Sequence, residues 1–231
     1  MNEYHTEPFT AEREWTVEGI PVLSAFVSLP QPEPRKDKVS RRIYRYYQLQ
    51  CRAFLRYCEN WLLPQAAAEY HAALAASAPL PEYRAEMEYR VTYHQGSLWS
   101  VYTQSRERTG ASPALLTRRG DTWDLAAGYP APLQDFFPAG APWKKRLLAL
   151  AAGEIERRER AGAGRFHEDW RRQLRRCFNP QNYYLTEEGL AFFYPMYAIA
   201  PASEGIPVFT LPLREEDASA CPSGRGLSIQ R

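Results

Sequence analysis

The sequence predicts an α+β protein, in which an antiparallel sheet is covered by a long helix and two further helices. Two observations favour this class. Segments of alternating polar and apolar residues occur near the N-terminus, in the middle of the chain and near the C-terminus. Helical periodicity follows the first of these segments and precedes the last. Sequential hairpins with helices inserted between them are typical of α+β proteins.

The bulk composition is that of a soluble globular protein. The chain has 231 residues, of which 45% are hydrophobic and 24% are charged. A net charge of +2 provides no overall attraction to nucleic acid or to a membrane. The N-terminus is polar, and no apolar run approaches the ~20 residues that a membrane span requires. We therefore expect a cytoplasmic protein without a membrane span.

The four cysteines do not predict a disulfide or a metal site. Cys51 and Cys58 lie on one predicted helix, roughly 10 Å apart along its axis, and Cys177 and Cys221 are distant in sequence. The chain lacks a Cys-x-x-Cys motif and any Cys/His cluster with zinc spacing. We expect reduced thiols, no structural metal and no cofactor.

The first third of the chain predicts a strand followed by a long helix. Residues 1–12 suggest a flexible lead-in, and residues 13–29 alternate as one strand with a bulge or edge at 19–21. Helical periodicity extends from about 36 to 77, and Pro64 is expected to end or kink that helix. The helix has an apolar stripe made of Val39, Ile43, Tyr47, Cys51, Phe54, Cys58 and Trp61.

The middle of the chain predicts two hairpins. Residues 82–93 and 97–106 alternate around a turn at 94–96. Residues 114–117 and 122–125 form a second, short hairpin around Arg119-Gly120-Asp121, where Asp121 and Asp124 are expected to cap the turn.

The last third predicts two helices and three strands. The helices cover 142–160 and 166–177, separated by Gly162-Ala-Gly164. Residues 182–201 read NYYLTEEGLAFFYPMYAIAP, which suggests two aromatic strands with a Glu-Glu-Gly turn and then a proline-bounded loop. A third strand follows at 206–213. Residues 214–231 lose the apolar pattern and suggest a disordered tail.

The segment 182–201 and the strand after it resemble the C-terminal domain of RsiV-type anti-sigma factors, a domain of unknown function that also occurs beside peptidoglycan deacetylases. Upstream, TGA at 109–111, DTWDLAAG at 121–128 and LQDFF at 133–137 resemble its usual N-terminal companion domain. The resemblance implies a companion domain over 13–137 and an RsiV-type part over 138–213, packed on the same core. Ser112 stands where the family commonly has His, and the anti-sigma segment and membrane helix are missing.

The resemblance implies a non-catalytic binding module. Family relatives are extracytoplasmic and bind lysozyme, so the implied partner is a lysozyme-like protein or a cell-wall glycan. The loop at 194–201 is the candidate contact, because a proline-bounded loop presents Tyr197 with little entropy to lose. The candidate ligand-binding residues are Tyr194, Met196, Tyr197 and Ile199.

Two alternatives involve other chemistry. A basic stripe on the long helix could bind an anionic polymer or nucleic acid, although such a stripe is usually a solvated helix face; it contains Arg41, Arg45, Arg52 and Arg56. A cell-wall saccharide hydrolase or accessory enzyme is the second alternative. The four histidines are scattered, and the chain lacks a nucleophile elbow, a phosphate-binding glycine loop and a carboxylate pair. The sequence therefore predicts that the protein is not an enzyme.

Overall fold

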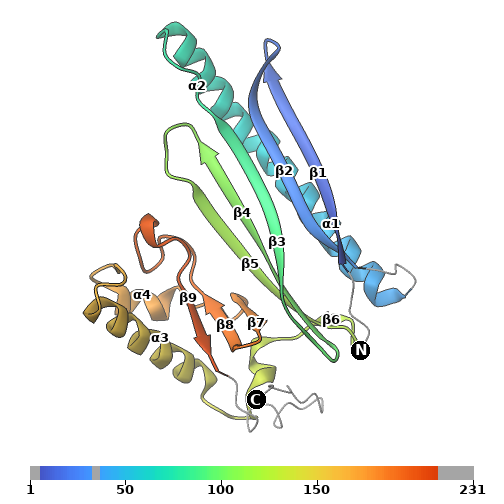
Figure 1. Ribbon diagram of the computed structural model, residues 1–231, viewed down its shortest axis with the longest axis vertical. Coiled ribbons are helices and arrows are strands. Elements are labelled where there is room, and N and C mark those ends of the chain that lie inside the picture. The colour runs from blue at the N-terminus through green and yellow to red at the C-terminus, as the bar shows by residue number, and fades with distance from the viewer. Residues whose placement is uncertain (1–5, 33–36, 213–231) are drawn as a thin grey trace. The chain divides into compact units, whose positions relative to one another are not determined.

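The computed structural model describes residues 6–32 and 37–212, and its fold class is α+β, as predicted. Six strands form one sheet in the order β1-β2-β3-β4-β5-β6, and three strands form another in the order β7-β8-β9 (Figure 1). The chain divides into two compact units, Met1–Tyr89 with Thr103–Leu116, and Arg90–Tyr102 with Thr117–Arg231. We call them unit 1 and unit 2.

Unit 1 begins with a long hairpin. Strands β1 (Thr6–Val17) and β2 (Ile20–Pro32) are antiparallel, and Glu18 and Gly19 between them both have positive φ, at 52° and 82°. Two central residues with positive φ match the right-handed twist of the flanking strands. The prediction of a single strand over 13–29 is therefore wrong, and so is a lead-in that extends to residue 12, because β1 begins at Thr6. Residues 1–5 lie outside the described residues.

A continuous helical segment follows the hairpin. It consists of α1 (Lys38–Tyr57), the π-helical turn η1 (Cys58–Leu62) and α2 (Leu63–Ala75). Asp37 caps its start, since its Oδ1 accepts from the backbone N–H groups of Val39 and Ser40 at 2.8 Å. Pro64 does not end the segment; it lies in the first turn of α2, directly after the π-helical turn. Because a proline ring clashes with the carbonyl four residues before it, the wider turn just ahead of Pro64 accommodates the ring.

The π-helical turn changes which residues of the stripe are buried. Ile43, Tyr47, Cys51, Phe54 and Cys58 are buried, as the predicted stripe requires. Beyond Cys58 the buried positions are Leu62, Ala66 and Tyr70, whereas Trp61 is 65% exposed. The prediction that Trp61 continues the stripe is wrong, because the extra residue in the wide turn rotates the following residues around the axis.

The helical segment connects β2 to a parallel strand. β3 (Tyr83–Gln95) pairs with β2 in parallel register, with Ser24 opposite Arg84 and Val27 opposite Met87. A sheet that is entirely antiparallel was expected. A helical crossover returns the chain to the end of the sheet from which β2 started, and a parallel neighbour results. β4 (Leu98–Thr109) follows β3 after a turn at Gly96, as predicted.

A single strand replaces the predicted second hairpin. β5 (Leu115–Asp124) runs without a break through Arg119-Gly120-Asp121, and its end pairs with β6 (Tyr129–Pro130). Gly120 lets the backbone of Tyr183 approach β5 closely. A Cβ atom at position 120 would lie 1.8 Å from the carbonyl oxygen of Tyr183. The predicted capping of a turn at 119–121 is therefore wrong; Asp124 caps the turn after β5, because its Oδ1 accepts from the N–H of Ala126 at 2.9 Å.

The C-terminal elements of unit 2 agree with the predicted order. They are the 3₁₀ turn η2 (Leu133–Phe136), α3 (Trp143–Arg160), α4 (Trp170–Arg176), β7 (Tyr183–Thr186), β8 (Gly189–Phe193), the 3₁₀ turn η3 (Ala202–Glu204) and β9 (Val208–Leu211). α4 begins four residues later than predicted. The predicted tail lies outside the described residues.

The main core of unit 2 lies between the helices and the small sheet. Figure 1 shows α3 and α4 on one side of β7, β8 and β9. Buried side chains of both helices join those of the strands in one cluster, which includes Leu147, Ile155, Trp170, Leu174, Phe192 and Phe209. Each large apolar side chain buried in this way stabilises the fold by about 1.5 to 3 kcal/mol. The small sheet is therefore the rigid support for the loop that leaves β8.

Replacing Gly120 by alanine is expected to lower the free energy of unfolding by more than about 2 kcal/mol, because the added methyl group overlaps the backbone of Tyr183. Gly153 in α3 is the matched control. A Cβ there meets no atom within 4 Å, so Gly153→Ala should stabilise the helix by about 0.5 to 1 kcal/mol. Thermal unfolding of both variants measures the two effects. Equal midpoints for the two variants would contradict the close approach at Gly120.

Candidate binding surface

The candidate site is the loop of residues 195–201, which connects β8 with η3 in unit 2. Tyr194 immediately before it is fully buried, and its hydroxyl donates to the carbonyl oxygen of Leu174 at 3.0 Å. Its backbone N–H donates to the carbonyl of Pro207 at 3.0 Å. Burial raises the pKa of the Tyr194 hydroxyl above its ordinary value, so this group stays a neutral donor. Tyr194 fixes the start of the loop to α4.

Tyr197 is the exposed residue at the centre of the loop. Its side chain is 49% exposed, and its φ of 68° lies in the left-handed region. A tyrosine is uncommon in this conformation, which persists only where the surroundings hold it in place. The N–H of Ala198 donates to the carbonyl of Pro195 at 3.0 Å, which closes a tight turn around Tyr197.

His167 holds the other side of this turn. Its backbone N–H donates to the carbonyl of Ile199 at 3.0 Å, and its ring Nε2 lies 3.3 Å from the carbonyl oxygen of Tyr197. With a proton on Nε2, the ring donates to that oxygen. His167 thus contacts the carbonyl groups of both Tyr197 and Ile199, although it lies thirty positions before Tyr197 in the sequence.

The structure divides the four predicted ligand-binding residues into two groups. Tyr194 and Ile199 are fully buried and belong to the core of unit 2. Met196 is half-buried and Tyr197 is exposed. The surface of the loop that a ligand can contact therefore contains Met196 and Tyr197, whereas Tyr194 and Ile199 support it from below.

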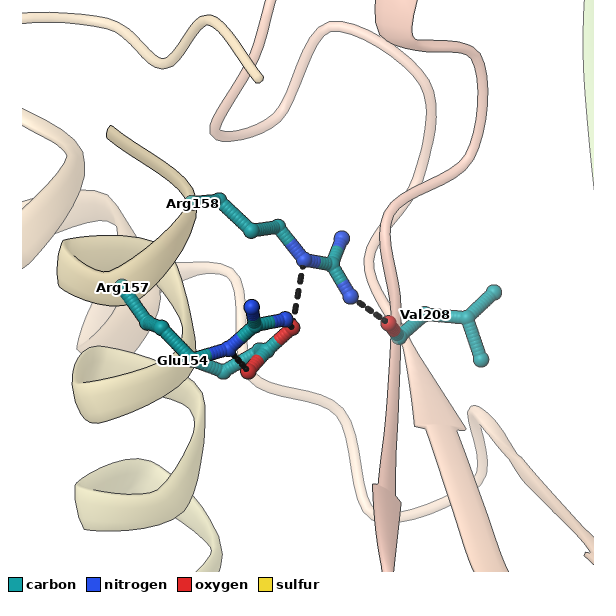
Figure 2. A network of polar contacts seen from close by, with 4 residues as sticks. All are labelled: Glu154, Arg157, Arg158 and Val208. Atoms are coloured by element: carbon teal, nitrogen blue, oxygen red, sulfur yellow. Dashed lines mark hydrogen bonds and ion pairs between the residues drawn. The ribbon is translucent and has the colours of Figure 1, made fainter. Parts of the chain in front are cut away.

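A network of charged side chains links α3 to the strand that follows the loop. Glu154 accepts hydrogen bonds from Arg157 at 2.7 and 2.8 Å and from Arg158 at 2.7 Å, and Arg158 Nη2 donates to the carbonyl of Val208 at 3.3 Å (Figure 2). The guanidinium of Arg158 also lies 5.5 Å from the ring centroid of Phe209. The hydrogen bond from Arg157 and the nearby guanidinium of Arg158 lower the pKa of Glu154 to about 2.

Glu204 holds the segment after the loop. Its Oε1 accepts from the backbone N–H of Arg165 at 3.0 Å. The contacts of His167 and Glu204 with the backbone both position the loop.

The alternative basic surface lies on α1 in unit 1. All four predicted arginines are exposed, and within the described ranges none of them forms a side-chain ion pair; they are Arg41, Arg45, Arg52 and Arg56. Their spacing places them on one line opposite the buried stripe, about 22 Å from first to last along the axis. These four arginines therefore form one solvent-exposed face of α1.

A second arginine cluster lies on α4, and its sequence pattern alone indicates only a solvated helix face. Arg171, Arg172, Arg175 and Arg176 of α4 line one hollow at the surface of unit 2. The run Trp-Arg-Arg-Gln-Leu-Arg-Arg contains the signal, because arginines at i, i+1, i+4 and i+5 of a helix share one side. No sequence pattern indicates the contacts of His167 with the loop, because His167 is distant from the loop in sequence.

Within 6–32 and 37–212, no group of three His, Cys, Asp or Glu side chains is placed to hold a metal ion. The helices in this part of the chain are all too short or too polar to cross a membrane.

Comparisons with known proteins find a family model that matches the C-terminal region. Residues 134–214, which contain α3, α4, the loop and the small sheet, match the model of a family described as protein of unknown function (DUF3298). The crystal structure of a DUF3298 family member from Bacteroides fragilis NCTC 9343 is similar, with a TM-score of 0.66, 16% identity and 90% of each chain covered. A DUF3298 family protein from Pseudomonas aeruginosa PAO1 gives a TM-score of 0.56 with 19% identity and 91% of each chain covered. A comparison with curated proteins gives no match.

At these identities the two crystal structures show a shared fold, and they extend the similarity beyond the matched segment to most of the chain. Because the family is one of unknown function, the comparison does not assign a ligand to the loop.

Tyr194→Phe is expected to lower the free energy of unfolding by about 1 kcal/mol, because it removes the donor to the buried Leu174 carbonyl. Tyr197→Phe is the control and should leave stability unchanged, since among residues 6–32 and 37–212 the Tyr197 hydroxyl has no hydrogen-bond partner. Denaturant titration of both variants tests the difference. A destabilisation by Tyr197→Phe as large as that by Tyr194→Phe would contradict this account.

Glu154→Gln is expected to destabilise the protein by roughly 0.5 to 1 kcal/mol at pH 7, because the ion pairs are partly exposed. The pKa of Glu154 is lower in the folded state than its ordinary value of 4.5. The stabilisation is therefore fully present above about pH 4.5 and is lost as the pH falls towards 2. Unfolding midpoints of both proteins between pH 7 and pH 2 should converge at the acidic end; a constant difference would refute the role of the carboxylate charge.

Proposed function

We propose that this protein is a non-catalytic binding module whose contact surface is the exposed part of the loop at residues 195–201. The observation that carries the proposal is the conformation of Tyr197. The ring is half exposed on a residue with positive φ, and the surrounding hydrogen bonds hold that backbone in place. A residue held in an uncommon conformation at the surface is a reason to infer function.

The side chain at this position suits recognition. A tyrosine ring offers a large apolar face and a polar hydroxyl, and it has few rotatable bonds. Because the turn from Pro195 to Ala198 already fixes the backbone, binding costs little additional conformational entropy. Met196 beside it supplies a flexible apolar side chain that adapts to the ligand.

The ligand class follows from the resemblance to the RsiV-type domain. A lysozyme-like protein or a cell-wall glycan is the proposed ligand, since an exposed tyrosine ring packs against either a protein pocket or the apolar face of a sugar. Both ligands lie outside the cytoplasm, so the proposal requires that the protein is exported. Cell fractionation tests this requirement directly.

The contacts of the titratable residues support binding over catalysis. His167 and Glu204 each use one polar side-chain atom, Nε2 and Oε1, to hold backbone atoms of the loop region, which is a positioning role. Turnover of chitooligosaccharides or peptidoglycan fragments by the full chain would overturn the non-catalytic assignment.

Tyr197→Gly is expected to weaken ligand binding at least tenfold, because it removes the exposed ring. The folded state should be unchanged in stability or more stable by up to about 1 kcal/mol, since glycine adopts positive φ without steric cost. Binding is measured by calorimetric titration with lysozyme and, separately, with soluble peptidoglycan fragments.

Tyr129→Ala is the matched control for that experiment. Tyr129 is also an exposed tyrosine of unit 2, but it belongs to β6. Its replacement should leave the affinity for the ligand unchanged. Equal losses in the two variants, or full affinity in Tyr197→Gly, would show that the loop is not the contact surface.

A further inference from the structure

We propose that helix α4 carries a binding site for multivalent oxyanions, that is, for ligands with two or more neighbouring carboxylate or phosphate groups. The site is the surface hollow lined by Arg171, Arg172, Arg175 and Arg176. It goes beyond the proposed function, because it does not involve Tyr197 and predicts a different ligand chemistry.

The sequence of α4 places the four arginines on one side. Trp170 and Leu174 are buried in the core of unit 2, and all four arginines are exposed. At 100° per residue, the four positions span an arc of about 140° that faces away from the buried side chains. From Arg171 to Arg176 the helix rises only about 8 Å.

This density of charge distinguishes α4 from the basic face of α1. Arg41, Arg45, Arg52 and Arg56 spread the same number of guanidinium groups over about 22 Å of helix. Guanidinium groups that are closer together repel one another more strongly, and they share a bound anion more easily. The cluster on α4 is therefore the stronger anion site of the two.

One of the four arginines is already held in place. Arg171 Nη2 lies 3.0 Å from Glu156 Oε1, and its guanidinium lies 4.3 Å from the ring centroid of Trp170. Because Trp170 is itself buried, this contact fixes Arg171 against the core. Arg171 thus lines the hollow with its guanidinium already paired.

The other three arginines are available for a ligand. In the described part of the chain, the side chains of Arg172, Arg175 and Arg176 form no ion pair or hydrogen bond. The neighbouring carboxylate of Asp169 accepts a hydrogen bond from Gln173 Nε2 at 2.8 Å, so its partner is Gln173 and not one of these arginines. Three uncompensated guanidinium groups in one hollow favour a ligand with several negative charges.

The geometry of the guanidinium group specifies the ligand chemistry. Each planar fork donates two parallel hydrogen bonds to the oxygens of a carboxylate or a phosphate. Adjacent forks on consecutive turns then bind adjacent anionic groups of one ligand. A monovalent anion engages one fork and gains little from the others.

The experiment is calorimetric titration of the full chain at low ionic strength with three probes: tripolyphosphate, tri-galacturonic acid and, as the monovalent comparison, acetate. Tripolyphosphate or the acidic trisaccharide is expected to bind at least tenfold more tightly than acetate. A preference for the first identifies a phosphate source, and a preference for the second identifies a carboxylate on a sugar. Binding should weaken strongly when salt is added.

Two triple variants decide whether the hollow is responsible. Replacing Arg172, Arg175 and Arg176 together by Gln should reduce the affinity at least tenfold, and replacing the three by Lys should reduce it less. The matched control replaces Arg41, Arg45 and Arg52 by Gln on α1, which removes the same charge and should leave the affinity unchanged. All of these side chains are exposed, so unaltered thermal midpoints are expected and confirm that each variant is folded.

Three results would overturn the proposal: acetate bound as tightly as the multivalent probes, no binding of any probe, or equal losses in the α4 and α1 variants. Tyr197→Gly should bind tripolyphosphate like the wild type. The failure of the anion site and the failure of the tyrosine loop are thus measured separately.

Discussion

The arrangement of unit 2 depends on the burial of both faces of strand β8. All five of its residues are buried. Leu190 and Phe192 face the core that α3 and α4 cover, while Ala191 and Phe193 belong to a second cluster with Tyr184. Arg118 closes that second side, with its guanidinium 4.3 Å from the ring centroid of Tyr102 and a hydrogen bond of 3.2 Å to the hydroxyl of Tyr184. A strand enclosed in this way cannot offer its aromatic rings to a ligand.

The same burial explains why the loop after β8 is the candidate site. The aromatic residues of the C-terminal strands pack the interior, so within residues 182–201 the exposed ring is the one at Tyr197, where the chain leaves the sheet. The segment that matches the DUF3298 family contains this support and this loop together, as well as the arginines of α4. The two proposed binding surfaces of unit 2 therefore share one scaffold.

Much of the fold is predictable from local patterns, and the errors have tertiary causes. Periodicity located the long helix and α3, and the Glu187-Glu188-Gly189 turn located the hairpin of β7 and β8. Alternation continued through Glu18 and Gly19, so the first hairpin looked like one strand. Gly120 resembled a turn residue because the reason for a glycine there, the close approach of Tyr183, comes from a residue sixty-three positions away.

The candidate site could be predicted only in part, because its burial and contacts also depend on tertiary packing. Its position in a proline-bounded loop, and Tyr197 within it, could be found from the sequence. Which of the four predicted residues are exposed could not, because the burial of Tyr194 and Ile199 depends on packing against distant helices. The contact of His167 with the Tyr197 carbonyl also joins residues that no local pattern connects.

The π-helical turn before Pro64 has a consequence for how this helix tolerates changes in length. Such a turn holds one residue more than regular α-helix, and Leu62, Ala66 and Tyr70 are buried in the register that follows it. Removing one residue between 58 and 62 would restore regular helix at the turn and keep Leu62, Ala66 and Tyr70 on the buried face, because the wide turn had taken up that residue. Tyr70 would therefore stay in the core of unit 1. At this turn the segment tolerates a single deletion that would rotate α2 by about 100° anywhere else along the helix.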